Sequence, residues 1–417
     1  MDDKFYFAGT DTTEIAKKYG TPVYVMDEDL IRKRINTIKE KFLDKYENTY
    51  AYYASKAFLC NYMIEILKDE DFGIDVVSYC ELMIALKNGM EPSKIMMHGN
   101  NKSTEELKLA IKSGVGRIVV DSLSELVLLR EILTESEKKV AVLFRLSPAV
   151  AGDTHKYITT GQLDSKFGIP IGSKELEEAL NIAIKSECID FKGIHFHIGS
   201  QLFSNSPYVE ATEKVFEIID WIKQEYDYHV EELNIGGGFG IKYTSMDEPL
   251  DIEYFLDPIM ELVEKKSREI SISRPVVYIE PGRYIVGEAG ITLYEVGSIK
   301  NIEGVRKYIS IDGGMPDNPR PALYQAKYDA VIANKYNSKD QELVTVAGKC
   351  CESGDILIWD IMLPKAERGD ILCVKSTGAY NFSMASNYNK LLRPPVVMVK
   401  EGVDKLVVKR QTCDDLF

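Results

Sequence analysis

Short apolar segments alternate with longer amphipathic segments along the chain as far as Arg283. The apolar segments are rich in Val, Ile and Tyr, as buried strands are, and the segments between them have helical spacing. In one of these, Ser103 and Glu106 form a capping box that predicts a helix start. The eight predicted strands are Thr49–Ser55, Gly73–Ser78, Lys94–His98, Arg117–Asp121, Lys139–Leu146, Phe191–His197, Glu232–Ile235 and Val276–Ile279. Eight strands separated by helices predict an α/β fold, a (β/α)8 TIM-type barrel.

The pattern changes after Arg283, where turn sequences such as Asp312-Gly313-Gly314 and Arg368-Gly369-Asp370 separate the apolar segments in place of helices. This predicts a mostly β C-terminal domain. Near the start of the chain, Pro22–Met26 is a further predicted strand, which we expect to pack on that domain. We therefore expect the barrel to span residues 28–280, with 1–27 and 281–417 forming the β domain.

The composition narrows the class of protein. The chain has 417 residues, of which 45% are hydrophobic and 28% charged, as in soluble globular proteins. No apolar run reaches the length of a membrane span, and the start of the chain has no signal-peptide pattern. A net charge of −14 argues against general binding to nucleic acid or to anionic membranes. The seven cysteines form no metal-type pairs, which favours reduced thiols and a cytoplasmic location.

Reactive residue types gather at the ends of the predicted strands. In a barrel these ends share one face, and active sites of this fold are built there. Polar residues also end strands for purely structural reasons, but that does not explain the mixture of types found here. The residues are Lys56, Asp75, His98, Asp121, Arg145, His197, Gly236–Gly238, and Glu280 with Arg283.

Lys56 ends an apolar, aromatic stretch that runs from Tyr50 to Leu59. An amine at such a strand end can be desolvated and lose its proton, as a lysine that forms a Schiff base must. A solvated surface lysine is the alternative, and for any single lysine it is the commoner case.

Two further motifs suit a phosphate and a flat ring. The glycine triplet Gly236–Gly238 leaves backbone N–H groups free to turn toward a phosphate, although glycine clusters are also common loop material. His195 and His197 lie on one side of a strand, and His197 is nearer the active face, where its ring could stack on a heterocycle while Ser200 donates to a phosphate. A metal site is the alternative for the histidines, but the sequence nearby offers no third ligand.

Glu280 ends the eighth predicted strand. In a site with an amine and a phosphate cradle, a carboxylate can keep a pyridine nitrogen protonated, which makes the ring an electron sink, as in pyridoxal phosphate chemistry. A structural pair with Arg283 is the alternative.

Taken together, these motifs resemble the fold-type III pyridoxal-phosphate decarboxylases, over nearly the whole chain. The matching stretches occur in the order typical of that family. They are Tyr53–Ala57, His98–Lys102, Thr160–Gly168, His195–Gln201, Gly236–Gly238, Glu280–Arg283, Arg320–Tyr324, Cys351–Asp355 and Gly378–Asn389.

The resemblance implies a role for each matching residue. Lys56 would hold pyridoxal 5'-phosphate covalently, His197 would stack on its ring, and Glu280 would pair with its nitrogen. The resemblance also implies a homodimer with shared active sites, in which Cys351, the candidate acid, and Glu352 reach in from the partner subunit; an isolated cysteine is more often a small buried hydrophobe. The phosphate would be held by Ser200, Gly236, Gly237, Gly238 and the Pro281-Gly282-Arg283 turn, with Tyr380 nearby. No metal is implied.

The substrate class follows from the same comparison. Arg283, Arg320 and Tyr324 match residues that bind a distal carboxylate, and Glu352 matches one that meets a distal amine; Tyr380 is also a candidate substrate contact. Since arginines facing a substrate without that carboxylate would be buried unpaired, meso-2,6-diaminopimelate, converted to L-lysine and carbon dioxide, is favoured.

Some features leave the substrate choice open. Gly348-Lys349-Cys350 and Tyr79-Cys80 depart from the usual family pattern. The long segment Ser147–Phe167 is a candidate mobile lid. A related decarboxylase acting on ornithine, arginine or carboxynorspermidine is the main alternative. Glu280 argues against an alanine racemase, and the C-terminal β domain argues against a non-catalytic pyridoxal-phosphate carrier.

Overall fold

The computed structural model describes residues 3–148, 150 and 165–417. They form two compact units. The barrel unit comprises residues 35–240 and 249–282, and the β-rich unit comprises residues 1–34, 241–248 and 283–417. The segment 241–248 thus belongs to the β-rich unit, although the sequence pattern placed it in the barrel. The reason is that Ile241 and Tyr243 are buried in the same hydrophobic cluster as Tyr294 and Ile309.

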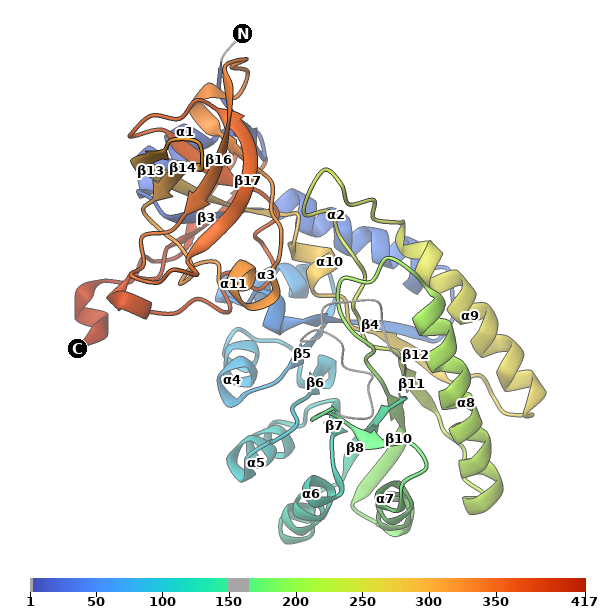
Figure 1. The fold of residues 1–417 in the computed structure, drawn as a ribbon. Helices are drawn as coiled ribbons and strands as arrows, with labels where there is room; N and C mark the ends of the chain where they lie inside the picture. Colours follow the sequence, from blue (N-terminus) through green and yellow to red (C-terminus); the bar gives the residue numbers. More distant parts are fainter. Residues whose placement is uncertain (1–2, 149, 151–164) are drawn as a thin grey trace. The chain divides into compact units, whose positions relative to one another are not determined.

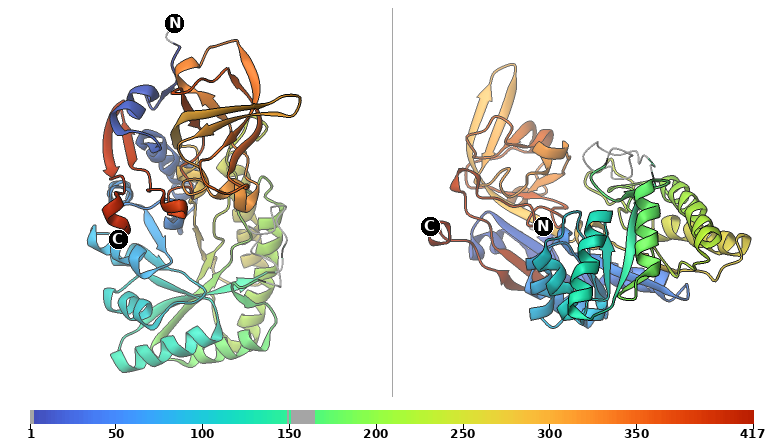
Figure 2. Two further views of the ribbon diagram at one scale, coloured as in Figure 1. Left: turned by 60° about the vertical axis from the view of Figure 1, so that its left-hand side comes forward. Right: turned by 90° about the horizontal axis from the view of Figure 1, so that it is seen from below.

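The barrel unit contains eight parallel strands that close on themselves, since β10 pairs with both β8 and β11. All eight predicted strands are confirmed, as is the (β/α)8 barrel, and helices surround it (Figures 1 and 2). Its strands are β4 Thr49–Ala54, β5 Gly73–Val76, β6 Ile95–Met97, β7 Arg117–Val120, β8 Val140–Ser147, β10 Ile189–His195, β11 Glu232–Asn234 and β12 Val276–Ile279, with the short β9 Ile169–Pro170 beside β8. Its helices are α3 Asn61–Asp69, α4 Tyr79–Lys87, α5 Thr104–Ser113, α6 Leu123–Ser136, α7 Lys174–Lys185, α8 Ser206–Tyr226 and α9 Ile252–Glu269; α2 Glu28–Ile38 leads into the unit.

Side chains fill part of the barrel interior, as expected for a barrel of this size. One buried cluster draws a residue from each of five strands: Tyr52, Met96, Val119, Leu143 and Tyr278. At the start of α5, the Ser103 side chain accepts from Glu106 N at 3.2 Å and Ser103 N donates to Glu106 Oε2 at 2.8 Å. The predicted capping box is therefore confirmed.

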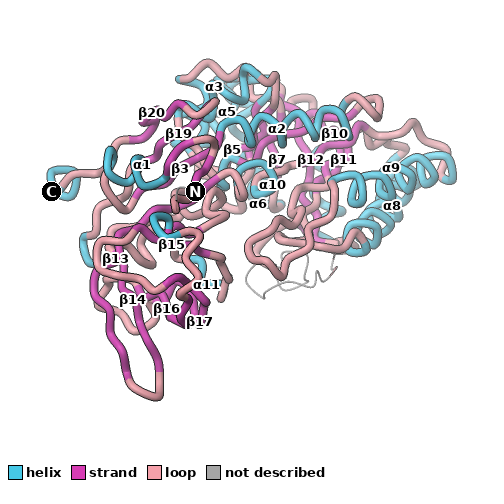
Figure 3. Tube along the Cα trace, turned by 90° about the horizontal axis from the view of Figure 1, so that it is seen from above, coloured by secondary structure: helices cyan, strands magenta, loops and turns pink. Residues whose placement is uncertain are grey.

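The β-rich unit is built on one large sheet with the strand order β17-β16-β14-β13-β3-β19-β20, while β18 pairs with β13 and β15. Strand β3 comes from the start of the chain and lies between β13, antiparallel, and β19, parallel, so the expected packing of this segment on the β domain is confirmed. In Figure 3, β13 and β14 form a long hairpin. The strands are β1 Tyr6–Phe7, β2 Thr10–Asp11, β3 Val23–Asp27, β13 Gly290–Ile302, β14 Arg306–Ile311, β15 Ala330–Ile332, β16 Gln341–Ala347, β17 Ile356–Pro364, β18 Ile371–Val374, β19 Val396–Lys400 and β20 Val403–Val408.

Helices in this unit are few and short. They are α1 Thr12–Tyr19, α10 Arg283–Val286 and α11 Arg320–Tyr324. The sequence pattern did not predict α11, whose five residues are too few to show helical spacing. Among the described residues of the whole chain, no helix is long and apolar enough to cross a membrane.

Candidate active site

The predicted reactive residues of the barrel unit lie at the carboxyl ends of its strands. Asp75 and Arg145 lie near the ends of β5 and β8. The others lie shortly after the end of a strand: Lys56 after β4, His98 after β6, Asp121 after β7, His197 after β10, Gly236–Gly238 after β11 and Glu280 after β12. The strands are parallel, so these residues share one face of the barrel. The candidate lid Ser147–Phe167 lies for the most part outside the described residues.

Lys56 is exposed, whereas its neighbours Ser55 and Ala57 are buried. The apolar strand therefore does not by itself bury the amine, which agrees with the alternative of an exposed lysine, and the chain enters a single 3-10 turn at this point. Asp75 lies close by and accepts a hydrogen bond from Ser55 N at 3.2 Å. Burial and the charge of Glu280 raise the pKa of Asp75 well above its usual value, against the opposing effect of Lys56.

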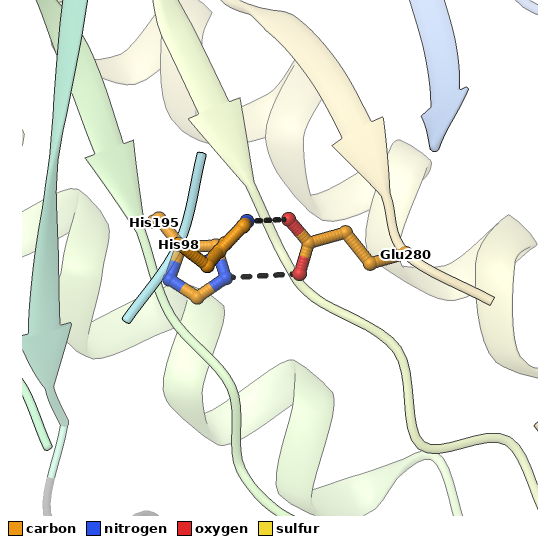
Figure 4. A group of neighbouring side chains, drawn as sticks. All are labelled: His98, His195 and Glu280. Carbon is orange, nitrogen blue, oxygen red and sulfur yellow. Dashed lines mark hydrogen bonds and ion pairs between the residues drawn. The ribbon is translucent and has the colours of Figure 1, made fainter. Parts of the chain in front are cut away.

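Glu280 is the centre of a buried polar cluster (Figure 4). Its Oε1 accepts a hydrogen bond from Asn234 Nδ2 at 2.8 Å, and its Oε2 lies 3.2 Å from His195 Nε2. His98 Nε2 lies 2.7 Å from Oε1, at an ion-pair distance but without the angle of a hydrogen bond. The two imidazole rings meet edge to face with their centroids 4.9 Å apart. Both carboxylate oxygens are thus approached by side chains that lie at the ends of three other strands, β6, β10 and β11.

The electrostatics of this cluster favour an ionised Glu280. Burial opposes ionisation, but His98 and His195 outweigh it and hold the pKa of the Glu280 carboxyl well below its usual range. Burial lowers the pKa of His195 to about 4, so its ring is neutral near pH 7. A neutral ring can donate through Nε2 only if Nδ1 carries no proton, and Nδ1 has no hydrogen-bond partner among the described residues.

His197 lies beside the glycine loop. Part of its surface remains accessible, but the surrounding protein desolvates the ring, and this, with the charges of Lys56 and Arg145, lowers its pKa well below the usual value. A side chain at Gly236 would come within 2.8 Å of His197 Nδ1. The absence of a side chain at Gly236 therefore allows the loop to pack directly against the imidazole.

The glycine triplet is required by close backbone packing. A Cβ would lie 2.0 Å from Glu280 O if placed on Gly237, and 2.2 Å from Gly199 O if placed on Gly238, where φ is +116°. In the described part of the chain, the N–H groups of Gly237 and Gly238 have no hydrogen-bond partner. The loop therefore offers backbone donors of the kind that bind phosphate, and its role as a phosphate site stays a prediction.

His98, His195 and Glu280 also have the composition of a metal site, because their ligand atoms lie within 4.8 Å of one another. The sequence offered only His195 with His197 as a metal pair and no third ligand. In the structure these two histidines have different neighbours, since His195 contacts Glu280 while His197 lies beside Gly236 of the glycine loop. The atoms of the three residues already contact one another, which favours a closed polar cluster over a metal centre.

The predicted arginines belong to the β-rich unit and are buried among tyrosines. The Arg320 guanidinium donates to Tyr328 Oη at 2.5 Å and lies 4.7 Å from the centroid of the Tyr243 ring. Arg283 donates to Tyr243 Oη and lies 4.8 Å from the centroid of Tyr380. Although burial opposes it, these tyrosines raise the pKa of Arg320 above its usual value. Arg283 and Arg320 thus share Tyr243, and both are cationic.

Cys351 and Glu352 are exposed on the loop between β16 and β17. Asp355 fixes this loop, since its Oδ2 accepts from Cys350 N at 2.8 Å and its Oδ1 from Met315 N at 2.7 Å. Tyr324 on α11 is partly exposed. Lys349 and Cys350, which depart from the family pattern, thus lie next to the carboxylate that fixes the loop.

The barrel and its active face define the class: an enzyme of the TIM-barrel type, with an amine, a carboxylate beside two imidazoles and a glycine loop at the carboxyl ends of the strands. The family model described as pyridoxal-dependent decarboxylase, pyridoxal binding domain, matches residues 28–287. The chain belongs to this family of pyridoxal-dependent decarboxylases, and its cofactor is pyridoxal 5'-phosphate.

Similar proteins cover almost the whole chain. Diaminopimelate decarboxylase of Bacillus subtilis is 47% identical over 408 residues, which is 98% of this chain and 93% of that protein. The solved structure of diaminopimelate decarboxylase from M. jannaschii in complex with L-lysine superposes with a TM-score of 0.93 at 36% identity, covering 100% of this chain and 95% of that one. The Helicobacter pylori enzyme, also solved with L-lysine, gives 0.89 at 30% identity, with coverages of 97% and 98%.

Two contacts of Glu280 were not predicted from the sequence. One is with His195 and the other is with Asn234. Asn234 also accepts from Gly236 N at 2.9 Å, which ties the glycine loop to the carboxylate. A signal was present for His98, which the strand-end pattern included without assigning it a function. Only the closure of the barrel shows that these residues meet, since they come from β6, β10 and β11.

Proposed function

We propose that this protein decarboxylates meso-2,6-diaminopimelate to L-lysine and carbon dioxide with pyridoxal 5'-phosphate as cofactor. The observation that carries the substrate choice is the environment of Arg320, which is 5% exposed. No carboxylate lies within ion-pair distance of Arg320 among the described residues. A buried guanidinium without an acidic partner is costly, so a carboxylate supplied by the substrate suits this position.

The residues of the barrel unit fit the cofactor. Lys56, exposed at the active face, would hold it covalently; Glu280 would meet the pyridine nitrogen and His197 the ring face. The phosphate would be held by Ser200, the unpartnered N–H groups of Gly237 and Gly238, Gly236, and the turn Pro281-Gly282-Arg283, with Tyr380 near it. When bound, pyridoxal phosphate accepts the electron pair left by the departing carbon dioxide.

The remaining residues act on the substrate. Arg283, Arg320 and Tyr324 bind the distal carboxylate that stays on the product, and Glu352 binds the distal ammonium. Cys351 donates the proton that replaces the lost carboxyl group. The exposure of Cys351 and Glu352 supports a homodimer in which this loop completes the active site of the partner subunit.

A cytoplasmic location is part of the proposal. All seven cysteines of the chain are free thiols, which suits a reducing compartment.

The test is an assay of the purified protein, loaded with pyridoxal phosphate, against meso-diaminopimelate, ornithine, arginine and carboxynorspermidine. We expect release of carbon dioxide and L-lysine from diaminopimelate alone. Decarboxylation of ornithine without activity on diaminopimelate would refute the substrate assignment, while leaving the family membership intact.

A further inference from the structure

Three side-chain nitrogens lie close to the two carboxylate oxygens of Glu280. Asn234 Nδ2 and His98 Nε2 both approach Oε1, and His195 Nε2 approaches Oε2. His98 and His195 are 6% and 1% exposed, so water does not compete for these contacts. Such an arrangement fixes both the plane and the ionisation of the carboxylate.

The protons in the cluster can be placed from the distances. A bare imidazole nitrogen 2.7 Å from a carboxylate oxygen would repel it, so His98 carries a proton on Nε2. His195 donates from Nε2 as well, and its Nδ1 is buried without a partner in the described residues. His195 therefore donates to Glu280, while the protonated Nε2 of His98 lies at contact distance from the carboxylate without the angle of a hydrogen bond.

A competing proton acceptor lies nearby. Asp75 is 4% exposed, and its carboxylate would repel a charged Glu280. The pKa of Asp75 lies well above its usual value, whereas the pKa of Glu280 lies well below its usual value. His98 and His195 lie beside Glu280, so these imidazoles favour Glu280 as the acid that stays ionised.

We propose that His98 and His195 are positioning residues that keep Glu280 an oriented carboxylate facing the pyridine nitrogen of the cofactor. The inference rests on the proposed role of Glu280 and is independent of which amino acid is the substrate. The histidines touch neither cofactor nor substrate in this role, and they act through Glu280.

The experiment uses the apoenzyme with pyridoxal phosphate labelled with 15N in its ring, without substrate. The variants are His98→Leu, His195→Leu and, for each position, the Gln variant, whose amide can donate from a place near that of Nε2. His229→Leu is the matched control, because His229 is an exposed histidine of the same unit. The equilibrium binding of pyridoxal phosphate and the pH dependence of the 15N shift are measured for each variant.

We expect each Leu variant to bind pyridoxal phosphate about tenfold more weakly, because each loses one close N–H contact to a charged group. The ring nitrogen should lose its proton at a lower pH in the Leu variants than in wild type. The Gln variants should recover most of both properties, and His229→Leu should match wild type. A variant that folded poorly would bind less pyridoxal phosphate, but the ring nitrogen of the bound fraction would lose its proton at the same pH as in wild type.

Leu variants with the wild-type titration of the ring nitrogen and the wild-type affinity would overturn the inference. Glu280→Gln separates this failure from failure of its premise. If the ring nitrogen keeps its proton in Glu280→Gln, then Glu280 is not its partner and the inference falls with that role. Failure of the diaminopimelate assay alone would affect neither measurement.

Discussion

Replacing Arg320 by Leu tests the substrate proposal most directly. The guanidinium is buried, donates to Tyr328 and lies over the ring of Tyr243, and it would form two charge-assisted hydrogen bonds to the distal carboxylate. Losing one partner of such a buried contact costs roughly 2–5 kcal/mol. At about 1.4 kcal/mol per factor of ten, kcat/KM for meso-diaminopimelate should fall roughly 30-fold to several thousand-fold. Leu fills the aromatic site without leaving a buried charge, so we expect the fold to be retained.

The assay is carbon dioxide release, combined with inhibition by two ligands. L-Lysine retains the distal carboxylate, so its inhibition should weaken in parallel with the loss of kcat/KM. The diamine 1,5-diaminopentane lacks that carboxylate, so its inhibition should change little. Arg306→Leu is the matched control, because Arg306 lies in the same unit, pairs with Asp360 and stacks on Trp359. Equal losses for lysine and for the diamine, or an unchanged kcat/KM, would refute the assignment of Arg320 to the distal carboxylate.

Three further predictions concern the cofactor anchor, the shared site and the pH dependence of stability. Lys56→Ala should abolish the visible absorbance of bound pyridoxal phosphate and shift the free energy of unfolding by less than about 0.5 kcal/mol, because Lys56 is exposed; persistence of the band would contradict its role. Lys56→Ala and Cys351→Ala should each be inactive yet regain about a quarter of wild-type activity after subunit exchange, since half of the dimers would carry one intact site; no recovery after verified exchange would exclude shared sites. Burial raises the pKa of Asp317 from 3.8 to about 7, so the folded chain holds a proton that the unfolded chain releases, and stability should fall as the pH rises between these values. Urea titrations at several pH values should show this slope, at most roughly 1.4 kcal/mol per pH unit, reduced in Asp317→Asn; equal slopes in both proteins would contradict it.

The fold was predictable from sequence because barrel strands are marked locally. Each strand is a short apolar segment followed by an amphipathic helix, and this pattern placed all eight strands of the barrel. The same local reading misplaced Ile241 and Tyr243. Those two residues follow a barrel strand in sequence but pack in the core of the β-rich unit, a preference that only long-range contacts express.

Part of the candidate site was likewise predictable from the sequence, and part was not. Lys56, His197, Glu280 and the glycine loop were found from their positions at strand ends, because parallel strands bring such ends to one face. The sequence left open whether Lys56 is desolvated or exposed, since the exposure of a side chain after a strand depends on the turn that follows.

The sequence by itself determined which residues gather on the active face, because the order of strands and helices in a barrel fixes the face to which each strand end belongs. Only the tertiary structure decided how those residues act on one another. His98, His195 and Asn234 come from three different strands, and their contacts with Glu280 exist only because the barrel closes around them. Ionisation depends on burial and on atoms a few ångströms away, and neither is written in the order of the residues.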